Sequence, residues 1–143
     1  MIGVDTNVLV HAHRRDAPLH GRCAAALRTL AEGTAPWALP WPCVHEFLAL
    51  VTHPRIFDPP TPCPQAAEQV EAWLESPSVT TVAETADHWS HLRRLLDEGR
   101  VAGPRVHDAR VAALCVAHGV RVLWTFDRDF SRWGGLLTAA PPD

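Results

Sequence analysis

Five acidic residues stand where apolar strand-like segments end or where apolar helix-like segments begin, and this placement constrains the chain more than any other feature of its sequence. They are Asp5, Glu46, Asp108, Asp127 and Asp129. An ionised carboxylate beside a hydrophobic core is costly to desolvate unless it has a partner. Several such groups gathered without matching cations would repel one another, so their convergence in space would indicate a bound divalent metal ion.

The apolar segments alternate between strand and helix patterns. Strands are expected at residues 1–5, 36–40, 78–83, 121–126 and 135–139, helices at 6–15, 19–33, 42–53, 65–76, 86–99 and 105–119, and a turn or short helix at 127–133. Gly33, Gly99 and Gly119 are expected to end three of the helices. The Pro-rich stretch 53–64 reads as a loop. This alternation predicts an α/β fold in which a mainly parallel sheet lies between helical layers.

Length and composition indicate one ordinary globular domain spanning residues 1–143. Hydrophobic residues make up 47% of the chain and charged residues 20%, which is typical of a soluble protein. No apolar run approaches the ~20 residues that a membrane helix needs. The first residues show no secretory signal. We therefore expect a cytoplasmic protein with no membrane segment.

The cysteines and the basic residues exclude several kinds of chemistry. Cys23, Cys43, Cys63 and Cys115 lie far apart in the sequence, so they are expected to be separate buried thiols rather than metal ligands or disulfides. The chain has no Lys, which excludes a P-loop and Schiff-base catalysis. The net charge of −3 is not typical of a nucleic-acid-binding protein, although Arg side chains can still surround an acidic site.

Each acid has a structural explanation beside the functional one. Asp5 and Asp127 each follow a strand, and sites of open α/β sheets form at the carboxyl ends of strands. Asp5 could instead cap the next helix, and Asp108 could compensate the dipole of its own helix. Glu46 has apolar residues three and four positions away on its helix, which favours a pocket over open solvent. Asp127 and Asp129 could form a solvated turn.

The ordered segments VDTNVL, HEFLAL, HDARVAA and LWTFDRDF resemble the PIN-domain ribonucleases, and especially the VapC toxins of bacterial toxin–antitoxin pairs. The resemblance covers essentially the whole chain and implies a three-layer α/β/α PIN-like fold. By position, the acidic quartet of the family is matched by Asp5, Glu46, Asp108 and Asp127. Asp129 matches an additional acid often present beside the fourth, and the accessory polar positions are matched by Asn7 and Thr125.

The resemblance implies a Mg²⁺- or Mn²⁺-dependent endoribonuclease that forms a homodimer and is inhibited by a small VapB-like antitoxin. A hard divalent ion prefers carboxylate oxygens, and a water deprotonated at such an ion can attack the RNA phosphodiester bond. Asp5 and Asp108 are expected to be the main metal ligands, with Asp127 completing the site directly or through water. Glu46 is expected to orient the attacking water or to hold a second ion. Whether Asp129 is a ligand stays open.

Two other functions are weighed against this one. A phosphotransferase of the haloacid-dehalogenase kind would use a D-x-D motif, but that motif should open the domain, whereas here it lies near the C-terminal end. A degenerate PIN module would bind RNA or protein without cleavage. The presence of all four acids argues against this alternative.

Further polar and aromatic residues are weaker candidates. The pairs His11–His13 and His88–His91 lack a third zinc ligand nearby and read as solvated surface, while His107 is a candidate RNA contact. The candidate phosphate contacts are Arg14, Arg15, Arg110, Arg128 and Arg132. The six Trp residues are expected to serve packing or a dimer interface rather than base stacking.

Overall fold

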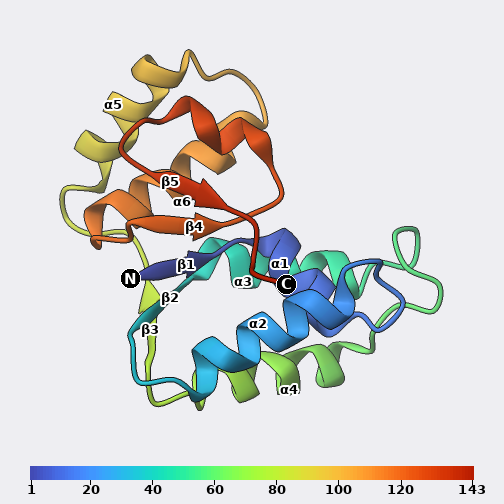
Figure 1. Ribbon diagram of the computed structural model, residues 1–143. Helices are drawn as coiled ribbons and strands as arrows, with labels where there is room; N and C mark the ends of the chain where they lie inside the picture. The colour runs from blue at the N-terminus through green and yellow to red at the C-terminus, as the bar shows by residue number, and fades with distance from the viewer.

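The computed structural model describes all residues from Met1 to Asp143. Its centre is a sheet of five parallel strands in the order β3-β2-β1-β4-β5 (Figure 1). The strands are β1 (Ile2–Val4), β2 (Trp37–Pro40), β3 (Val79–Val82), β4 (Val122–Trp124) and β5 (Leu137–Ala139). Every strand lies in a segment where the sequence predicts one, and the sheet is entirely rather than mainly parallel.

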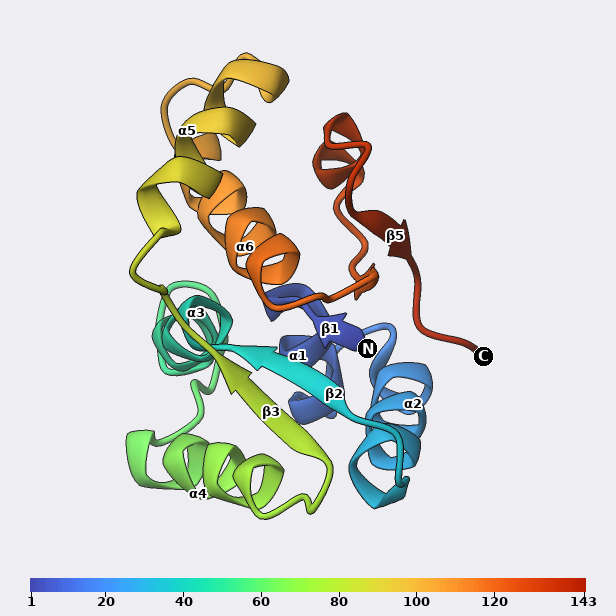
Figure 2. The same ribbon diagram turned by 90° about the vertical axis from the view of Figure 1, so that its left-hand side faces the viewer.

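Six α-helices and one short 3₁₀ helix connect the strands. They are α1 (Thr6–His13), α2 (His20–Glu32), α3 (Trp41–Val51), α4 (Cys63–Leu74), α5 (His88–Gly99), α6 (Arg105–Ala117) and η1 (Arg128–Arg132). Figure 2 shows α5 and α6 above strands β2 and β3, with α4 below them and α2 to the right of β2. The predicted three-layer α/β/α architecture is therefore confirmed. None of these helices is long and apolar enough to cross a membrane.

The hydrophobic core lies on both faces of the central strands. Trp37, Leu39 and Leu123 are fully buried, and α6 contributes a continuous buried run from Val111 to Cys115. Strands covered on both faces need apolar side chains at successive positions, which is why these segments show no alternation of apolar and polar residues. The Trp residues that serve packing, as predicted, are Trp37, Trp73, Trp124 and Trp133. Trp89 is exposed instead.

The pairing of β1 with β4 positions the candidate site. Val4 pairs with Trp124 at the carboxyl ends of the two strands, and the Asp5 N–H continues the ladder by donating to the Trp124 carbonyl at 3.0 Å. The chain moves outward from β1 to β2 and β3 and then returns to β4, so the direction of the strand order reverses between β1 and β4. Ligand sites of open parallel sheets form at such a reversal.

Several element boundaries differ from the predicted ones by a few residues. Helix α4 begins at Cys63, inside the predicted loop, because Pro64 can occupy a first helical turn. Cys63 is consequently exposed, which corrects the expectation of four buried thiols; all four cysteines are free. Gly33 directly follows α2 as predicted, whereas Gly119, with φ of 70°, lies two residues beyond α6.

Helix α5 ends differently from the prediction. Gly99 is its last residue, and Arg100 rather than a glycine takes the left-handed conformation, with φ of 47°. Gly99 has another role, because a Cβ at this position would lie 2.7 Å from Nε1 of Trp133. That indole N–H donates to the Leu95 carbonyl at 2.9 Å. Gly99 therefore allows Trp133 to pack directly against α5.

Replacing Gly99 by Ala should lower the free energy of unfolding by about 1–3 kcal/mol, because the added methyl group displaces the Trp133 indole. Gly21→Ala is a matched control, since Gly21 lies in α2 and a Cβ there meets nothing within 4 Å. This control should raise the free energy of unfolding by about 0.5–1 kcal/mol. Urea unfolding of both variants measures these changes. Equal effects of the two substitutions would contradict the packing role of Gly99.

Candidate active site

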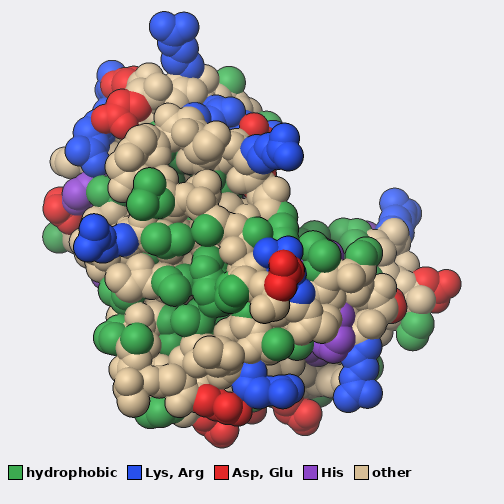
Figure 3. Space-filling view, in the orientation of Figure 1, with side chains coloured by type: hydrophobic (Ala, Val, Ile, Leu, Met, Phe, Trp, Pro, Cys, Tyr) green, Lys and Arg blue, Asp and Glu red, His purple; other side chains and the backbone are tan.

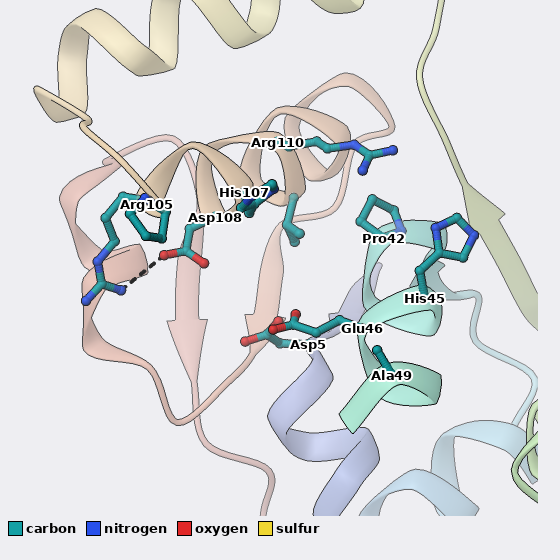
Figure 4. A pocket seen from close by; sticks show the side chains of 11 residues that line it. Asp5, Pro42, His45, Glu46, Ala49, Arg105, His107, Asp108 and Arg110 are labelled. Atoms are coloured by element: carbon teal, nitrogen blue, oxygen red, sulfur yellow. Dashed lines mark hydrogen bonds and ion pairs between the residues drawn. The ribbon is translucent and has the colours of Figure 1, made fainter. Parts of the chain in front are cut away.

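A pocket of about 540 Å³ lies beyond the carboxyl end of β1, between helices α3 and α6 (Figure 4). Asp5, Glu46 and Asp108 line it. Asp5 and Glu46 lie side by side in Figure 4, and Asp108 projects from α6 on the other wall. The other charged or imidazole side chains in its walls are His45, Arg105, His107 and Arg110. The pocket therefore combines carboxylates with a rim of basic groups.

Asp5 is the most constrained of the acids. It is the N-cap of α1, and its Oδ1 accepts a hydrogen bond from the Thr6 N–H at 2.8 Å. Its Oδ2 accepts from Thr125 Oγ1 at 2.7 Å and from Asn7 Nδ2 at 3.0 Å. The capping role that the sequence allowed for Asp5 is therefore present together with its place in the pocket. One carboxylate serves both.

Asn7 and Thr125 join the ends of β1 and β4 around Asp5. Asn7 Nδ2 also donates to Thr125 Oγ1 at 3.1 Å, and Asn7 Oδ1 accepts from the Phe126 N–H at 3.2 Å. Thr125 Oγ1 in turn accepts from the Asp127 N–H at 3.0 Å. These bonds restrict the Asp5 side chain to one orientation and hold the chain that follows β4. Asn7 and Thr125 thus position the carboxylate of Asp5 and the backbone at Asp127.

Glu46 faces the pocket, as its apolar neighbours indicated. Its Oε2 accepts a hydrogen bond from Thr6 Oγ1 at 2.8 Å, a contact that no sequence pattern predicts. Cys43, three residues earlier on α3, is fully buried with its Sγ 3.7 Å from Asp5 Oδ1. Helix α3 therefore places one carboxylate and one thiol against Asp5.

The environment of Asp5 disfavours its ionised form. Burial, with a smaller contribution from the charge of Glu46, raises the pKa of Asp5 from 3.8 to about 6, even though hydrogen bonds from Thr125 and Thr6 act to lower it. The side chain is almost inaccessible, since the residue is only 6% exposed. No cation offsets the burial of this carboxylate. A nearby positive charge would therefore stabilise it strongly.

Arg105, the first residue of α6, pairs with the other acids. Its guanidinium lies 3.1 Å from Asp108 Oδ2 and 3.4 Å from Asp127 Oδ2, and it also contacts the Asp129 carboxylate. Arg105 is not among the site residues predicted from the sequence, although its spacing of three residues from Asp108 is a signal for an ion pair on a helix. The expectation that the acids lack matching cations is wrong for these three.

The structure divides the four acids expected to form the site. Asp5, Glu46 and Asp108 line the pocket, whereas Asp127 lies outside its lining and caps η1 by accepting from the Asp129 N–H at 2.9 Å. Asp108 is paired with Arg105 on the side of the pocket away from Glu46 (Figure 4). No three His, Cys, Asp or Glu side chains lie close enough together to surround one ion. In this structure the side chains of Asp5, Glu46, Asp108 and Asp127 therefore do not meet around one point, although the sequence led us to expect that they would.

The other candidate contacts are only partly near the pocket. Arg110 lines it and forms an ion pair with Glu84, and His107 lines it as well. Arg14 instead pairs with Asp16 and donates to a carbonyl of the Pro-rich loop. The Arg candidates that do not line the pocket are Arg14, Arg15, Arg128 and Arg132. The histidine pairs form no zinc site with a third ligand.

Comparison with known protein families agrees with this geometry. The PIN domain profile matches residues 2–136. The chain belongs to the PIN-domain family. Among its PIN-domain relatives is ribonuclease VapC48 of Mycobacterium tuberculosis, 33% identical over 137 residues that cover 96% of this chain and 94% of that protein. Ribonuclease VapC31 of the same organism is 34% identical over 142 residues, covering 99% of both chains. The resemblance to VapC proteins predicted from the sequence is therefore confirmed.

Two solved structures confirm the PIN fold. The toxin VapC20 of Mycobacterium tuberculosis superposes with a TM-score of 0.69 at 20% identity, over 94% of this chain and 95% of that chain. VapBC2 of Rickettsia felis superposes with a TM-score of 0.67 at 19% identity, over 98% of both chains. At these identities the likeness concerns the fold alone.

The donors of this PIN-domain pocket fit a hard divalent cation. All the candidate ligands are carboxylate oxygens, which Mg²⁺ and Mn²⁺ prefer over softer donors. The raised pKa of Asp5 means that its negative charge is poorly compensated. A cation beside Asp5 and Glu46 would supply that compensation.

In the absence of metal, ionisation of Asp5 should lower the stability of the PIN domain. The folded pKa of about 6 exceeds the reference of 3.8, so the folded state binds the Asp5 proton more tightly than the unfolded state. The stabilisation from this proton is complete below pH 3.8 and is lost as the pH rises through about 6. The loss is at most about 3 kcal/mol.

Asp5→Asn does not titrate and therefore isolates this effect from other groups. In EDTA, the free energy of unfolding of wild type minus that of Asp5→Asn should decrease between about pH 4 and pH 6 and stay constant above about pH 7. Urea unfolding at each pH gives the difference. A difference that does not change with pH would show that Asp5 ionises like an exposed carboxylate.

Proposed function

We propose that this PIN domain, residues 1–143, is a Mg²⁺- or Mn²⁺-dependent endoribonuclease and the toxin of a toxin–antitoxin pair. The observation that carries the proposal is the pocket shared by Asp5, Glu46 and Asp108, in a chain whose relatives are named VapC ribonucleases. One structural neighbour is described as a toxin that cleaves the sarcin–ricin loop. This description supports an RNA substrate for the present chain.

Each acid has a proposed role in hydrolysis of the phosphodiester bond. Asp5 and Asp108 hold the metal ion, and Asp127 completes the site directly or through water. A bound divalent ion supplies Lewis acidity toward water and toward the phosphate oxygens. Glu46, whose carboxylate is oriented by Thr6, accepts a hydrogen bond from the attacking water or holds a second ion. The hydrogen bonds to Asp5 keep it in place for its role, so little side-chain motion is needed during the reaction.

The pocket suits a single RNA strand. His45, His107 and Arg110 line it from α3 and α6 and can donate hydrogen bonds to phosphate oxygens. The cavity volume of about 540 Å³ is in the range of sites for small ligands. The pocket can therefore receive one unstacked nucleotide of a single-stranded RNA, which is how proteins commonly recognise RNA sequence.

We also propose a homodimer, a VapB-like antitoxin as partner and a cytoplasmic location. One structural neighbour is VapBC2 of Rickettsia felis bound to a DNA fragment from their promoter, which supports an antitoxin partner. Figure 3 shows hydrophobic side chains gathered over the middle of one face, with charged side chains toward its margins. On the edge strand β5, Leu137 is 63% exposed. Exposed apolar surface of this kind is common at protein interfaces.

The purified protein should cut RNA in Mg²⁺ or Mn²⁺ and leave 5′-phosphate and 3′-hydroxyl ends, because water attacks the phosphorus in line. EDTA should abolish cleavage. Asp5→Asn and Asp108→Asn should each lower the rate more than about a hundredfold, since groups that merely orient metal ligands already contribute 10- to 100-fold. Gel analysis of end-labelled RNA measures the rates and the product ends.

Asp97→Asn is the matched control, because Asp97 is an exposed carboxylate on α5 paired with Arg93 and lies outside the pocket. It should cut RNA like wild type. Cyclic-phosphate ends or full activity in EDTA would overturn the metal-dependent mechanism. Tight RNA binding without cleavage in any divalent metal would establish the degenerate PIN module instead.

A further inference from the structure

The acids around the pocket fall into two groups with opposite charge environments. Asp5 and Glu46 adjoin each other, and no Arg compensates Asp5. Asp108, Asp127 and Asp129 come from two separate segments of the chain and all pair with the guanidinium of Arg105, while Asp129 also lies 3.8 Å from Arg132. Arg105 also lines the pocket. Two of the proposed metal ligands, Asp108 and Asp127, are therefore neutralised by Arg105 in the place where a metal ion would otherwise neutralise them.

We propose that Arg105 is an internal counter-ion that a divalent cation displaces from Asp108 and Asp127, and that its freed guanidinium then binds a phosphate of the RNA. The first half rests on the metal site of the proposed function, and the second half rests on its RNA substrate. The exchange between Arg105 and the metal ion concerns the protein without RNA.

The ion pairs of Arg105 are strong enough to form and weak enough to exchange. The Arg105 side chain is 43% exposed, and its partners Asp108, Asp127 and Asp129 are 25%, 35% and 37% exposed. Solvent and salt screen pairs at this exposure, so each contributes little net free energy. A divalent ion brings twice the charge to the same carboxylates and binds their oxygens at shorter distance. The ion therefore competes successfully for these ligands.

Stabilisation of α6 does not explain the position of Arg105. It is the first residue of the helix, where the macrodipole presents positive charge and disfavours a cation. Asp108 in the first turn already supplies the favourable negative charge. An Arg is tolerated at this point because the carboxylates in front of it outweigh the dipole. Loss of those carboxylates to a metal ion would leave the guanidinium unpaired at the helix start.

The freed guanidinium has a natural second partner. Arg105 lines the pocket, and Figure 4 shows it beside Asp108 at the edge of the site, on the side away from Glu46. A planar guanidinium binds carboxylate and phosphate with the same pair of parallel hydrogen bonds. The side chain can thus pass from one anion to the other without leaving the site.

Titration of the RNA-free protein with Mn²⁺ tests the exchange by calorimetry at fixed pH and ionic strength. Arg105→Gln should bind Mn²⁺ about three- to tenfold more tightly than wild type, because the ion no longer displaces a cation. Arg110→Gln is the matched control: it removes the same charge from the same pocket, but Arg110 pairs with Glu84 rather than with the acids. Its Mn²⁺ affinity should change less than twofold, about the error of such titrations.

Arg105→Lys keeps the charge but lacks the fork that reaches several carboxylates, so its Mn²⁺ affinity should lie between those of wild type and Arg105→Gln. Thermal melts in EDTA check that every variant is folded. If Arg105→Gln is not folded, the Mn²⁺ affinity of Arg105→Lys tests the exchange instead. An Mn²⁺ affinity of the Arg105 variants equal to or weaker than that of wild type would overturn the exchange.

Binding of a short single-stranded RNA tests the second half. The measurements use a Glu46→Gln background, which keeps the three proposed metal ligands while removing the group that orients the attacking water. Arg105→Gln should weaken RNA binding about three- to tenfold in Mn²⁺ and reduce the salt slope by about 0.7, the value for one phosphate contact on a single strand. In EDTA, Arg105→Gln should not weaken RNA binding, because Arg105 is then held by the acids.

If Arg105→Gln weakens RNA binding equally in Mn²⁺ and in EDTA, Arg105 contacts RNA without leaving the carboxylates. That result would overturn the transfer of the guanidinium to the RNA phosphate. Absence of RNA binding by every protein would overturn both the phosphate contact and the proposed function. The Mn²⁺ titration would still decide the exchange itself, because it contains no RNA.

Discussion

The carboxylate of Asp5, held at the junction of β1 and β4, is the constraint on which the rest of the site depends. The two strands are far apart in the sequence, and the hydrogen bonds of Thr125 and Asn7 to Asp5 join them at the sheet edge where the strand order reverses. The same carboxylate caps α1. Hydrogen bonds to a charged group typically contribute about 1.5–3 kcal/mol each, so the fold gains from keeping Asp5 in place even though burial raises its pKa.

Magnitudes show where the electrostatic strain of the site is concentrated. The shift in the pKa of Asp5 from 3.8 to about 6 corresponds to about 3 kcal/mol of preference for the neutral form. The ion pairs of Arg105 are screened by solvent, so each contributes little net free energy. The strain therefore lies at Asp5, where no cation is present, whereas Asp108 and Asp127 pair with Arg105. A site with this distribution is prepared for a ligand rather than for stability alone, as is common at functional sites.

The sequence was sufficient for features that depend on local patterns and insufficient for those that depend on long-range contacts. Strands β1, β2 and β4 were predictable because central parallel strands are apolar at successive positions, and Glu46 was predictable as a pocket residue from its neighbours on α3. Thr6 and Cys43 contact the acids only because α1 and α3 pack together in the fold. Arg105 could have been paired with Asp108 from spacing, but its contact with Asp127 arises from the return of the chain to β4. The close approach of Trp133 to Gly99 is likewise a long-range contact that no local pattern predicts.

Metal and RNA make opposite demands on this pocket, and its charges reconcile them. Carboxylates repel phosphate, so a chain with a net charge of −3 and acids in its active-site pocket should receive RNA poorly while those acids are uncompensated. A divalent ion neutralises the acids and releases Arg105 toward the substrate, which makes each of the two ligands favour the binding of the other. By thermodynamic linkage, RNA must then raise the affinity for metal by the same factor as metal raises the affinity for RNA. If the proposed exchange holds, clustering the carboxylates and Arg105 at a single sheet edge is thus a way to make RNA binding conditional on a divalent ion.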